Sequence, residues 1–185
     1  MDRKKILDHI SINKKIKRIS LQIIESNITE NEIIIAGIER KGFIIAKKIH
    51  DEINKISEIK VKMCNVKIDK NNPLNEISTS LNSEKFQNKS VIVIDDVLNS
   101  GATLMYTVKY FLNTRLKVLK TVVLVDRNHK KYPIKADFKG LSLSTSIQNK
   151  VEVSINGDKI EAYFCLLYTS PSPRDIRRSR MPSSA

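Results

Sequence analysis

The sequence of 185 residues has no tryptophan and only two cysteines, five glycines and five prolines. Cys64 and Cys165 are too few and too far apart for a disulfide framework or for a metal-binding spacing. No apolar run reaches the length of a membrane span, and residues 1–5 are not followed by the apolar stretch of a signal peptide. These absences exclude disulfide-rich secreted proteins and membrane-spanning proteins, and they predict a cytoplasmic protein without membrane contact.

The formal net charge of +13 draws attention to nucleic acids and to polyphosphate ligands. Residues 165–185 hold four arginines and one aspartate, so the rest of the chain carries +10. There the lysines are scattered among asparagine and isoleucine, a combination that A/T-rich coding alone produces. Charge spread in this way is mostly solvated surface, so net charge by itself leaves open whether the lysines serve a ligand.

The composition changes abruptly at residue 165, where serine, proline and arginine replace lysine, asparagine and isoleucine. Pro171 and Pro173 disfavour regular structure in this stretch. It resembles the translated read-through of a sequencing adapter, and the alternative is a genuine basic tail that binds RNA. We therefore expect one domain over residues 1–164, followed by a disordered, non-native tail at 165–185.

Before the tail, helical and strand patterns alternate along the chain. Alternation of this kind predicts an α/β fold with a parallel sheet flanked by helices. Helices are predicted by Ile12, Ile16, Ile19 and Ile23 with Ser11 as N-cap, by Phe43, Ala46, Ile49 and Ile53, and by Leu104, Val108 and Phe111. Buried strands are predicted at residues 33–36, which Gly37 ends, and at 61–66, 91–94 and 121–125.

Two further segments depart from this alternation. Residues 151–155 and 160–164 alternate in polarity around Asn156-Gly157, which predicts a small antiparallel hairpin. Residues 69–88 are polar and have no clear period, which is typical of a lid or of a disordered connection.

The most informative segment runs from Val91 to Leu104 and reads Val-Ile-Val-Ile-Asp-Asp-Val-Leu-Asn-Ser-Gly-Ala-Thr-Leu. It predicts a buried strand with Asp95 and Asp96 at its carboxyl end, then a short polar turn that opens a helix. Ligands of open α/β sheets bind at that edge, and a helix N-terminus there suits a phosphate. Helix capping alone would need one polar residue, not two carboxylates followed by Ser-Gly-x-Thr. The segment therefore indicates a ribose 5-phosphate site.

Two other turns follow predicted strands at the same edge. Gly37-Ile38-Glu39-Arg40-Lys41-Gly42 brackets two cations with glycines, so backbone N–H groups and positive charge can converge on one anion. Residues 126–134 hold Arg127, His129 and Lys130. For both turns, an ordinary charged surface loop is the alternative.

Residues 91–103 resemble the phosphoribosyl-pyrophosphate motif of the type I phosphoribosyltransferases: an apolar strand, two acidic residues, two apolar positions and x-Thr/Ser-Gly-x-Thr. With Gly37-Ile-x-x-x-Gly42 and Val-Leu-Val-Asp-Arg-x-His-x-x-x-Pro-Ile-x-Ala-Asp-Phe at 123–138, the likeness extends over residues 6–164. It is closest to the bifunctional group of pyrimidine-operon regulators and uracil phosphoribosyltransferases. The resemblance implies the type I phosphoribosyltransferase fold, with five parallel strands and a small hood over their carboxyl edge.

The resemblance also implies roles for residues at matching positions. It assigns no catalytic residue and no direct protein ligand to a metal, although Mg²⁺ is expected to accompany phosphoribosyl pyrophosphate on the ligand's own oxygens and water. Residues 69–88 would form a lid. The implied site residues are Asp95 and Asp96 for the ribose, Asn99, Ser100, Gly101, Ala102 and Thr103 for the 5′-phosphate, Glu39, Arg40, Lys41 and Gly42 for pyrophosphate, and Arg127 and His129 near the base or a phosphate.

The sequence departs from the family pattern at three places. Arg40-Lys41 replaces a Thr-Arg pair, and the usual Arg-Asp-Asp of the lid has only Lys67, Asp69 and Lys70 as counterparts. Lysine offers a point charge and not a planar fork, so pyrophosphate binding is expected to differ. Asn99 replaces the aspartate common in enzymes for 6-oxopurines and cannot take a proton, which argues against purine bases.

These observations leave three functions open. The first is transfer of a phosphoribosyl group from phosphoribosyl pyrophosphate to a pyrimidine, most plausibly uracil, by a homo-oligomer such as a dimer. The second is a nucleotide-sensing regulator that binds an mRNA leader, and the third is an inactive module of the same fold. Candidate RNA contacts are Lys14, Lys15, Lys17, Arg18, Lys130, Lys131 and Lys150. Residues 14–18 line a predicted helix, for which a solvated face is the plainer interpretation.

Overall fold

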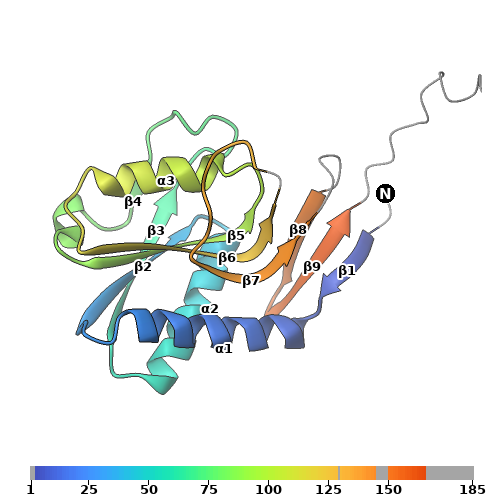
Figure 1. Ribbon diagram of the computed structural model, residues 1–185, viewed down its shortest axis with the longest axis horizontal. Helices are drawn as coiled ribbons and strands as arrows, with labels where there is room; N and C mark the ends of the chain where they lie inside the picture. The colour runs from blue at the N-terminus through green and yellow to red at the C-terminus, as the bar shows by residue number, and fades with distance from the viewer. Residues whose placement is uncertain (1–2, 129, 145–149, 166–185) are drawn as a thin grey trace, which may run out of the picture.

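The computed structural model describes residues 3–128, 130–144 and 150–165, and these form a six-stranded sheet, a smaller three-stranded sheet and three α-helices (Figure 1). The large sheet has the order β4-β3-β2-β5-β6-β7, and all its neighbours pair in parallel except β4 with β3. In chain order the elements are β1 (Arg3–Leu7), α1 (His9–Ser26), β2 (Glu32–Ile38), α2 (Lys41–Ile56), β3 (Lys60–Lys67), β4 (Ser78–Thr79), a 3₁₀ turn (Ser83–Phe86), β5 (Ser90–Leu98), α3 (Ala102–Leu112), β6 (Val118–Arg127), β7 (Phe138–Leu143), β8 (Lys150–Asn156) and β9 (Lys159–Cys165).

Helices cover both faces of the large sheet, as the continuous apolar strands predict. Figure 1 shows α1 and α2 on one side and α3 on the other. Ile33 and Ile35 of β2 point into the core beneath α1 and α2, whereas Ile34 points to the opposite face, where α3 contributes Leu104 and Phe111. Because successive strand residues alternate between faces, a strand buried on both sides needs an unbroken apolar run.

The predicted N-cap of α1 is wrong. Asp8, not Ser11, precedes the helix, and its Oδ1 accepts a hydrogen bond from the Ser11 backbone N–H at 2.8 Å. Ser11 therefore occupies the third position of the helix and supplies one of the backbone N–H groups that a cap must satisfy.

Gly37 does not end its strand as predicted. It lies inside β2 and pairs with both Asn65 and Ile94. A Cβ at this position would lie 2.7 Å from the Cβ of Ala46, so glycine allows α2 to pack closely on the strand. Likewise Thr107, not Val108, is buried in α3, where its Oγ1 donates to the Thr103 carbonyl at 2.8 Å.

The hood is confirmed and is larger than the predicted hairpin. The expected strands β8 and β9 are joined by β1, which pairs with β9, in the order β1-β9-β8. The pattern also missed β7, which pairs in parallel with β6 and completes five parallel strands. Both missed strands lie at an edge and hold charged or small residues, so neither has the continuous apolar signal of a central strand.

The predicted lid at 69–88 is only in part a surface connection. Its second half forms β4 and the 3₁₀ turn, and Phe86 is fully buried against Phe111 with ring centroids 5.0 Å apart. The longest stretch of this segment without regular structure, apart from turns, is residues 69–77.

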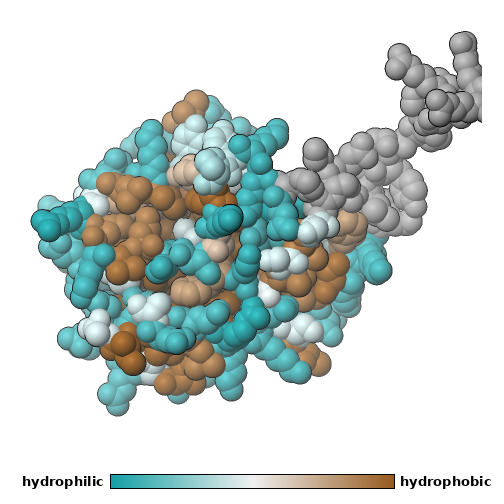
Figure 2. Space-filling view, in the orientation of Figure 1, coloured by the Kyte–Doolittle hydropathy of each residue, from teal (hydrophilic) through white to brown (hydrophobic). Residues whose placement is uncertain are grey.

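The surface in Figure 2 is mainly hydrophilic, with an apolar area around α3. Among the exposed large apolar residues are Leu112, at the end of α3, and Leu74, in the segment after β3. Among the described residues, no helix is long and apolar enough to cross a membrane.

Candidate active site

Asp95 and Asp96 lie near the carboxyl end of the central strand β5. The Asp95 side chain is 5% exposed and that of Asp96 is 13% exposed. Asp95 Oδ1 also accepts the Asp96 backbone N–H at 2.9 Å, which fixes the orientation of its carboxylate. Burial, reinforced by the adjacent charge of Asp96, raises the pKa of Asp95 to about 7.

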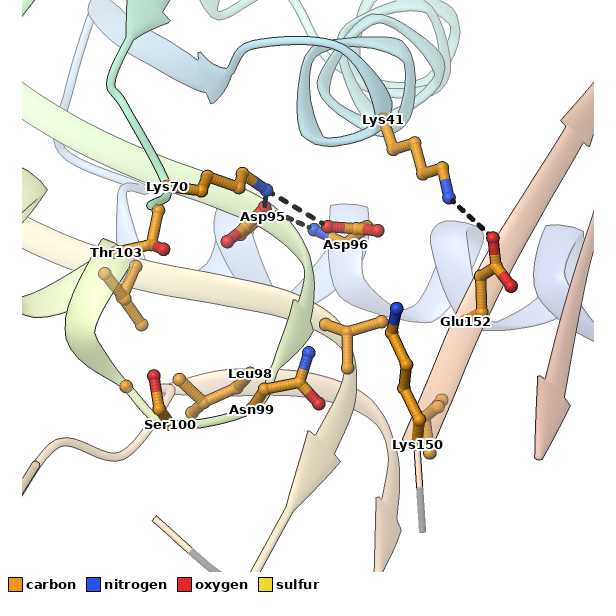
Figure 3. Close-up of a pocket in the computed structure, with 14 residues that line it drawn as sticks. Lys41, Lys70, Asp95, Asp96, Leu98, Asn99, Ser100, Thr103, Lys150 and Glu152 are labelled. Atoms are coloured by element: carbon orange, nitrogen blue, oxygen red, sulfur yellow. Dashed lines mark hydrogen bonds and ion pairs between the residues drawn. The ribbon is translucent and has the colours of Figure 1, made fainter. Parts of the chain in front are cut away.

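Lys70, which the sequence did not assign to the site, forms an ion pair with both carboxylates. The Nζ of Lys70 lies 3.1 Å from Asp95 Oδ1 and 3.6 Å from Asp96 Oδ1, as the dashed lines in Figure 3 show. Burial alone would lower the pKa of Lys70, but the charges of Asp95 and Asp96 outweigh it and raise that pKa. Lys70 is therefore held as a cation between two carboxylates.

The turn after β5 opens α3 with its N-terminus toward the same place. Gly101 precedes the helix with φ +87°, a left-handed conformation that favours glycine. Ser100 Oγ accepts the Ala102 N–H at 3.3 Å, and Thr103 lies in the first turn of the helix. A helix N-terminus with hydroxyls beside it can bind a phosphate through N–H groups and the helix dipole.

This turn is braced from the loop after β6. The carbonyl oxygen of Ser100 accepts the N–H groups of Lys131 and Tyr132 at 2.9 and 3.0 Å. Arg127 Nη1 donates to Asn99 Oδ1 at 3.0 Å, and burial lowers the pKa of this arginine. The predicted segments at 95–103 and 126–134 are therefore brought together, although His129 lies outside the described residues.

The turn between β2 and α2 lies beside the acidic pair. A Cβ on Gly42 would stand 3.0 Å from the Ile94 carbonyl and 3.2 Å from Asp95 Oδ1, so glycine lets the start of α2 approach β5. Arg40 has φ 69°, which is uncommon for a residue with a side chain. Lys41 reaches the hood, where its Nζ lies 3.6 Å from Glu152 Oε1.

Two adjacent hollows result from these contacts. One, of about 190 Å³, holds most of the predicted groups and is drawn in Figure 3. The other, of about 420 Å³, has Glu39 and Arg40 in its wall, and Lys70 lines both. The smaller hollow is lined by Lys41, Lys70, Asp95, Asp96, Val97, Leu98, Asn99, Ser100, Gly101, Thr103, Leu104, Lys150, Val151 and Glu152.

The hood supplies residues that the sequence did not assign to a small-molecule site. Lys150, Val151 and Glu152 of β8 face the turn at 99–101 across the smaller hollow. The alternation of residues 151–155 identified a strand but gave no sign of which sheet edge it would cover. In the sequence, Lys70 stands out only as a departure from the lid pattern of the family. Its positive charge is the one property that could have suggested a partner for Asp95 and Asp96.

The described side chains around the smaller hollow do not form a metal site without a ligand. The described residues include no group of three or more His, Cys, Asp or Glu side chains placed to hold a metal ion, and an ammonium stands between the two aspartates. Mg²⁺ usually keeps several waters and binds together with ligand phosphates. The described residues therefore fit an ion that arrives with a phosphorylated ligand.

Comparisons with known proteins agree with this geometry. Residues 2–156 match the model of the phosphoribosyl transferase domain. A protein from Clostridium kluyveri named bifunctional protein PyrR is 33% identical over 158 residues, which cover 82% of this chain and 89% of that protein. Its namesake from Clostridium acetobutylicum is 33% identical over 163 residues, with 83% and 90% covered.

Solved structures show the same fold. A hypoxanthine-guanine phosphoribosyltransferase from Bacillus anthracis superposes with a TM-score of 0.70 at 19% identity, covering 88% of this chain and 99% of that chain. A hypoxanthine phosphoribosyltransferase from Trypanosoma cruzi, in complex with IMP, gives 0.70 at 16% identity, with 85% and 92% covered. The family model spans most of the chain and is consistent with the sheet order, so the chain belongs to the phosphoribosyl transferase domain family.

Proposed function

We propose that the protein transfers the phosphoribosyl group of phosphoribosyl pyrophosphate to uracil, forming the nucleoside 5′-monophosphate and pyrophosphate. The observation that carries this proposal is one hollow lined by the acidic pair, by the N-terminus of α3 and by Lys41 from the start of α2, with Glu39 and Arg40 in the adjoining hollow. These groups suit the ribose hydroxyls, the 5′-phosphate and the pyrophosphate, in that order. The proposed contacts are Asp95 and Asp96, then Asn99, Ser100, Gly101, Ala102 and Thr103, then Glu39, Arg40, Lys41 and Gly42.

In the proposed reaction the bond between the anomeric carbon and pyrophosphate breaks, and a bond to a base nitrogen forms. The nitrogen loses its proton to solvent, and the sugar passes through a cation-like state. This chain's residues would act by holding the two reactants in register and by stabilising the departing pyrophosphate with lysine and arginine charge. Bound Mg²⁺ would add positive charge to the pyrophosphate oxygens.

The preference for a pyrimidine rests on the chain's own residues and on the sequence resemblance. Asn99 lies at the mouth of the turn, where its Oδ1 is held by Arg127. An amide cannot take up a proton as a carboxylate can, so the position is unsuited to handling a purine proton. The likeness to the pyrimidine-operon regulator and uracil phosphoribosyltransferase group supports the same choice.

The test measures ligand binding and pyrophosphate release with the full chain, Mg²⁺, phosphoribosyl pyrophosphate and each of uracil, cytosine, hypoxanthine and guanine. We expect release that depends on uracil. Replacing both aspartates (D95N with D96N) should weaken binding about a hundred-fold or more, because two charge-assisted hydrogen bonds are lost. D158N, in the exposed β8–β9 turn, is the matched control. Failure of the unaltered protein to bind phosphoribosyl pyrophosphate would contradict the proposal.

A second candidate is a nucleotide-sensing regulator that binds an mRNA leader. It is favoured by a hollow of about 920 Å³ that Lys130, Lys131, Lys135 and Lys139 line near the end of β6. Lys130 and Lys139 are partly engaged there by buried Asp126, and Arg18 is committed to the carbonyls of Lys139 and Gly140. Tight ligand binding without turnover, together with leader-RNA affinity that falls steeply with salt, would favour this role.

A further inference from the structure

Lys70 bridges the two carboxylates at the base of the proposed ribose site. In Figure 3 its side chain extends toward Asp95 and Asp96 from the segment that follows β3. Two adjacent buried carboxylates repel each other, and the Lys70 ammonium at 3.1 and 3.6 Å is the cation that offsets this repulsion. A ribose whose hydroxyls bind these carboxylates must share or displace that ammonium.

The position of Lys70 gives the ammonium a second place to go. Lys70 lines the hollow that holds the acidic pair and also the neighbouring hollow with Glu39, Arg40 and Lys67 in its wall. Its side chain is 46% exposed, whereas that of Asp95 is 5% exposed. A lysine has a flexible four-carbon stem, so the ammonium can turn from one hollow to the other without moving the backbone.

The backbone that carries Lys70 is fixed by its neighbour. Asp69 Oδ1 accepts the N–H groups of Asn71 and Asn72 at 2.9 and 3.2 Å, and Asp69 Oδ2 accepts from Asn75 Nδ2 at 3.0 Å. These hydrogen bonds hold the start of the segment in a tight turn. The backbone of Lys70 is thus held in place, whereas its long side chain leaves the ammonium free to reorient.

We propose that Lys70 binds the substrate by exchanging partners: it bridges Asp95 and Asp96 in the empty site and turns to the pyrophosphate when the ribose takes the carboxylates. This inference rests on the proposed function. The exchange moves the Lys70 ammonium from the ribose end of phosphoribosyl pyrophosphate to its pyrophosphate end. Binding of the ribose then directs positive charge to the bond that breaks.

The exchange also affects how the acidic pair ionises. The charged groups that face Asp95 are Asp96 on its own strand and Lys70 from the segment after β3, while Lys41, from the α2 end, is paired with Glu152 of the hood. Of these, Lys70 lowers the pKa of Asp95 and Asp96 raises it. Without Lys70, Asp95 should hold its proton to a higher pH.

For the unaltered chain, K70M and K70R, titration calorimetry measures binding of ribose 5-phosphate, and then binding of pyrophosphate with Mg²⁺ to the protein saturated with ribose 5-phosphate. We expect K70M to bind pyrophosphate about ten-fold more weakly, since a charge-assisted contact is lost, and K70R to recover most of that affinity. The pH midpoint of ribose 5-phosphate binding should rise by about one unit or more in K70M and not in K70R.

K62M is the matched control, because Lys62 pairs with Glu32 at the opposite end of the sheet. Unchanged pyrophosphate affinity in K70M would overturn the exchange, and so would an unchanged pH midpoint. A purely structural role would weaken ribose 5-phosphate binding and leave pyrophosphate binding intact. Absence of phosphoribosyl pyrophosphate binding by the unaltered chain would instead refute the proposed function, so the two failures are distinguishable.

Discussion

Asp95 is a residue whose ionised form works against the stability of the fold. Its pKa in the folded protein is about 7, above the ordinary value of 3.8, mainly because it is buried. The folded state therefore binds more protons than the unfolded state between these two values. Its contribution to stability is present below about pH 4 and is lost as the pH rises through about 7.

Because the ionisation of Asp95 destabilises the folded protein, D95N should become more stable relative to the unaltered protein as the pH rises. At about pH 5 Asp95 is mostly protonated in the folded protein but mostly ionised in the unfolded chain, so part of the effect is already present there. Between about pH 5 and pH 8 we expect the stability of D95N relative to the unaltered protein to rise further, by about 1–3 kcal/mol. Urea unfolding at both pH values measures the difference. A difference that does not grow with pH would show that Asp95 does not titrate in this range.

Gly101 has both a backbone conformation that would strain any other residue and a close neighbour. Its φ is +87°, and a Cβ there would lie 2.8 Å from Ile134 Cγ2. G101A should lower the free energy of unfolding by about 1–2 kcal/mol and weaken ribose 5-phosphate binding about ten-fold, because the turn must shift.

Gly157 provides the control for that substitution. It also has positive φ, at +56°, but a Cβ there has no neighbour within 4 Å, and it lies in the β8–β9 turn. G157A should therefore lose about 1 kcal/mol of stability and keep its ligand affinity. Equal loss of ribose 5-phosphate binding in both variants would mean that backbone strain, not the shape of the turn, explains the effect.

The position of a site residue was predictable from the sequence where a single segment contains both the strand and the polar side chains that follow it. Asp95, Asp96 and Ser100 are such cases, and the structure places them together. Glu152 was not predictable as a pocket residue, because its place depends on how a separate sheet packs over the strand ends. Their roles in ligand binding stay predictions.

Helix α1 is the element whose start the sequence misplaced by three residues. Serine and aspartate are both good N-caps, and both occur here, at Asp8 and Ser11. The side-chain and backbone hydrogen bonds from Ser11 also lower the pKa of Asp8. The apolar period fixes the helix face but does not decide between two caps on the same turn.

Two substitutions test this assignment. D8A should lower the free energy of unfolding by about 1 kcal/mol, since it removes the acceptor for a helix N–H group. S11A should cost clearly less, because the backbone N–H of residue 11 is still bound to Asp8. Thermal unfolding of both variants at neutral pH compares them. A larger loss in S11A would restore the original assignment of the cap.

The central strands were predictable because burial on both faces leaves a continuous β-branched run. The strands at the edges were not. β7 contains Gly140 and Ser142, and β1 begins with Arg3, Lys4 and Lys5. These residues suit an edge or a half-exposed sheet, where the alternation is short and the apolar content low.

At the scale of the whole molecule, the domain boundary is open to test. β9 extends one residue past the expected end of the domain, and Cys165 pairs with both Arg3 and Lys150. Protein ending at Cys165 should unfold within about 2 °C of the full chain, measured by circular dichroism. Protein ending at residue 158 lacks the central strand of the hood and should show a large loss of stability. A large loss in the first variant would show that residues 166–185 belong to the folded unit.

The hood joins the two ends of the described chain. β1 pairs with β9, and Lys5 contacts Glu161 across 156 residues of sequence. Contacts this distant in sequence form late, because the intervening chain must be ordered first. During synthesis β1 has no partner until β9 leaves the ribosome, so the sheet that covers the smaller hollow is the last described part to assemble. A nascent chain that already has its parallel sheet would therefore hold an open acidic pair, which is covered only once β9 has joined β1 and β8.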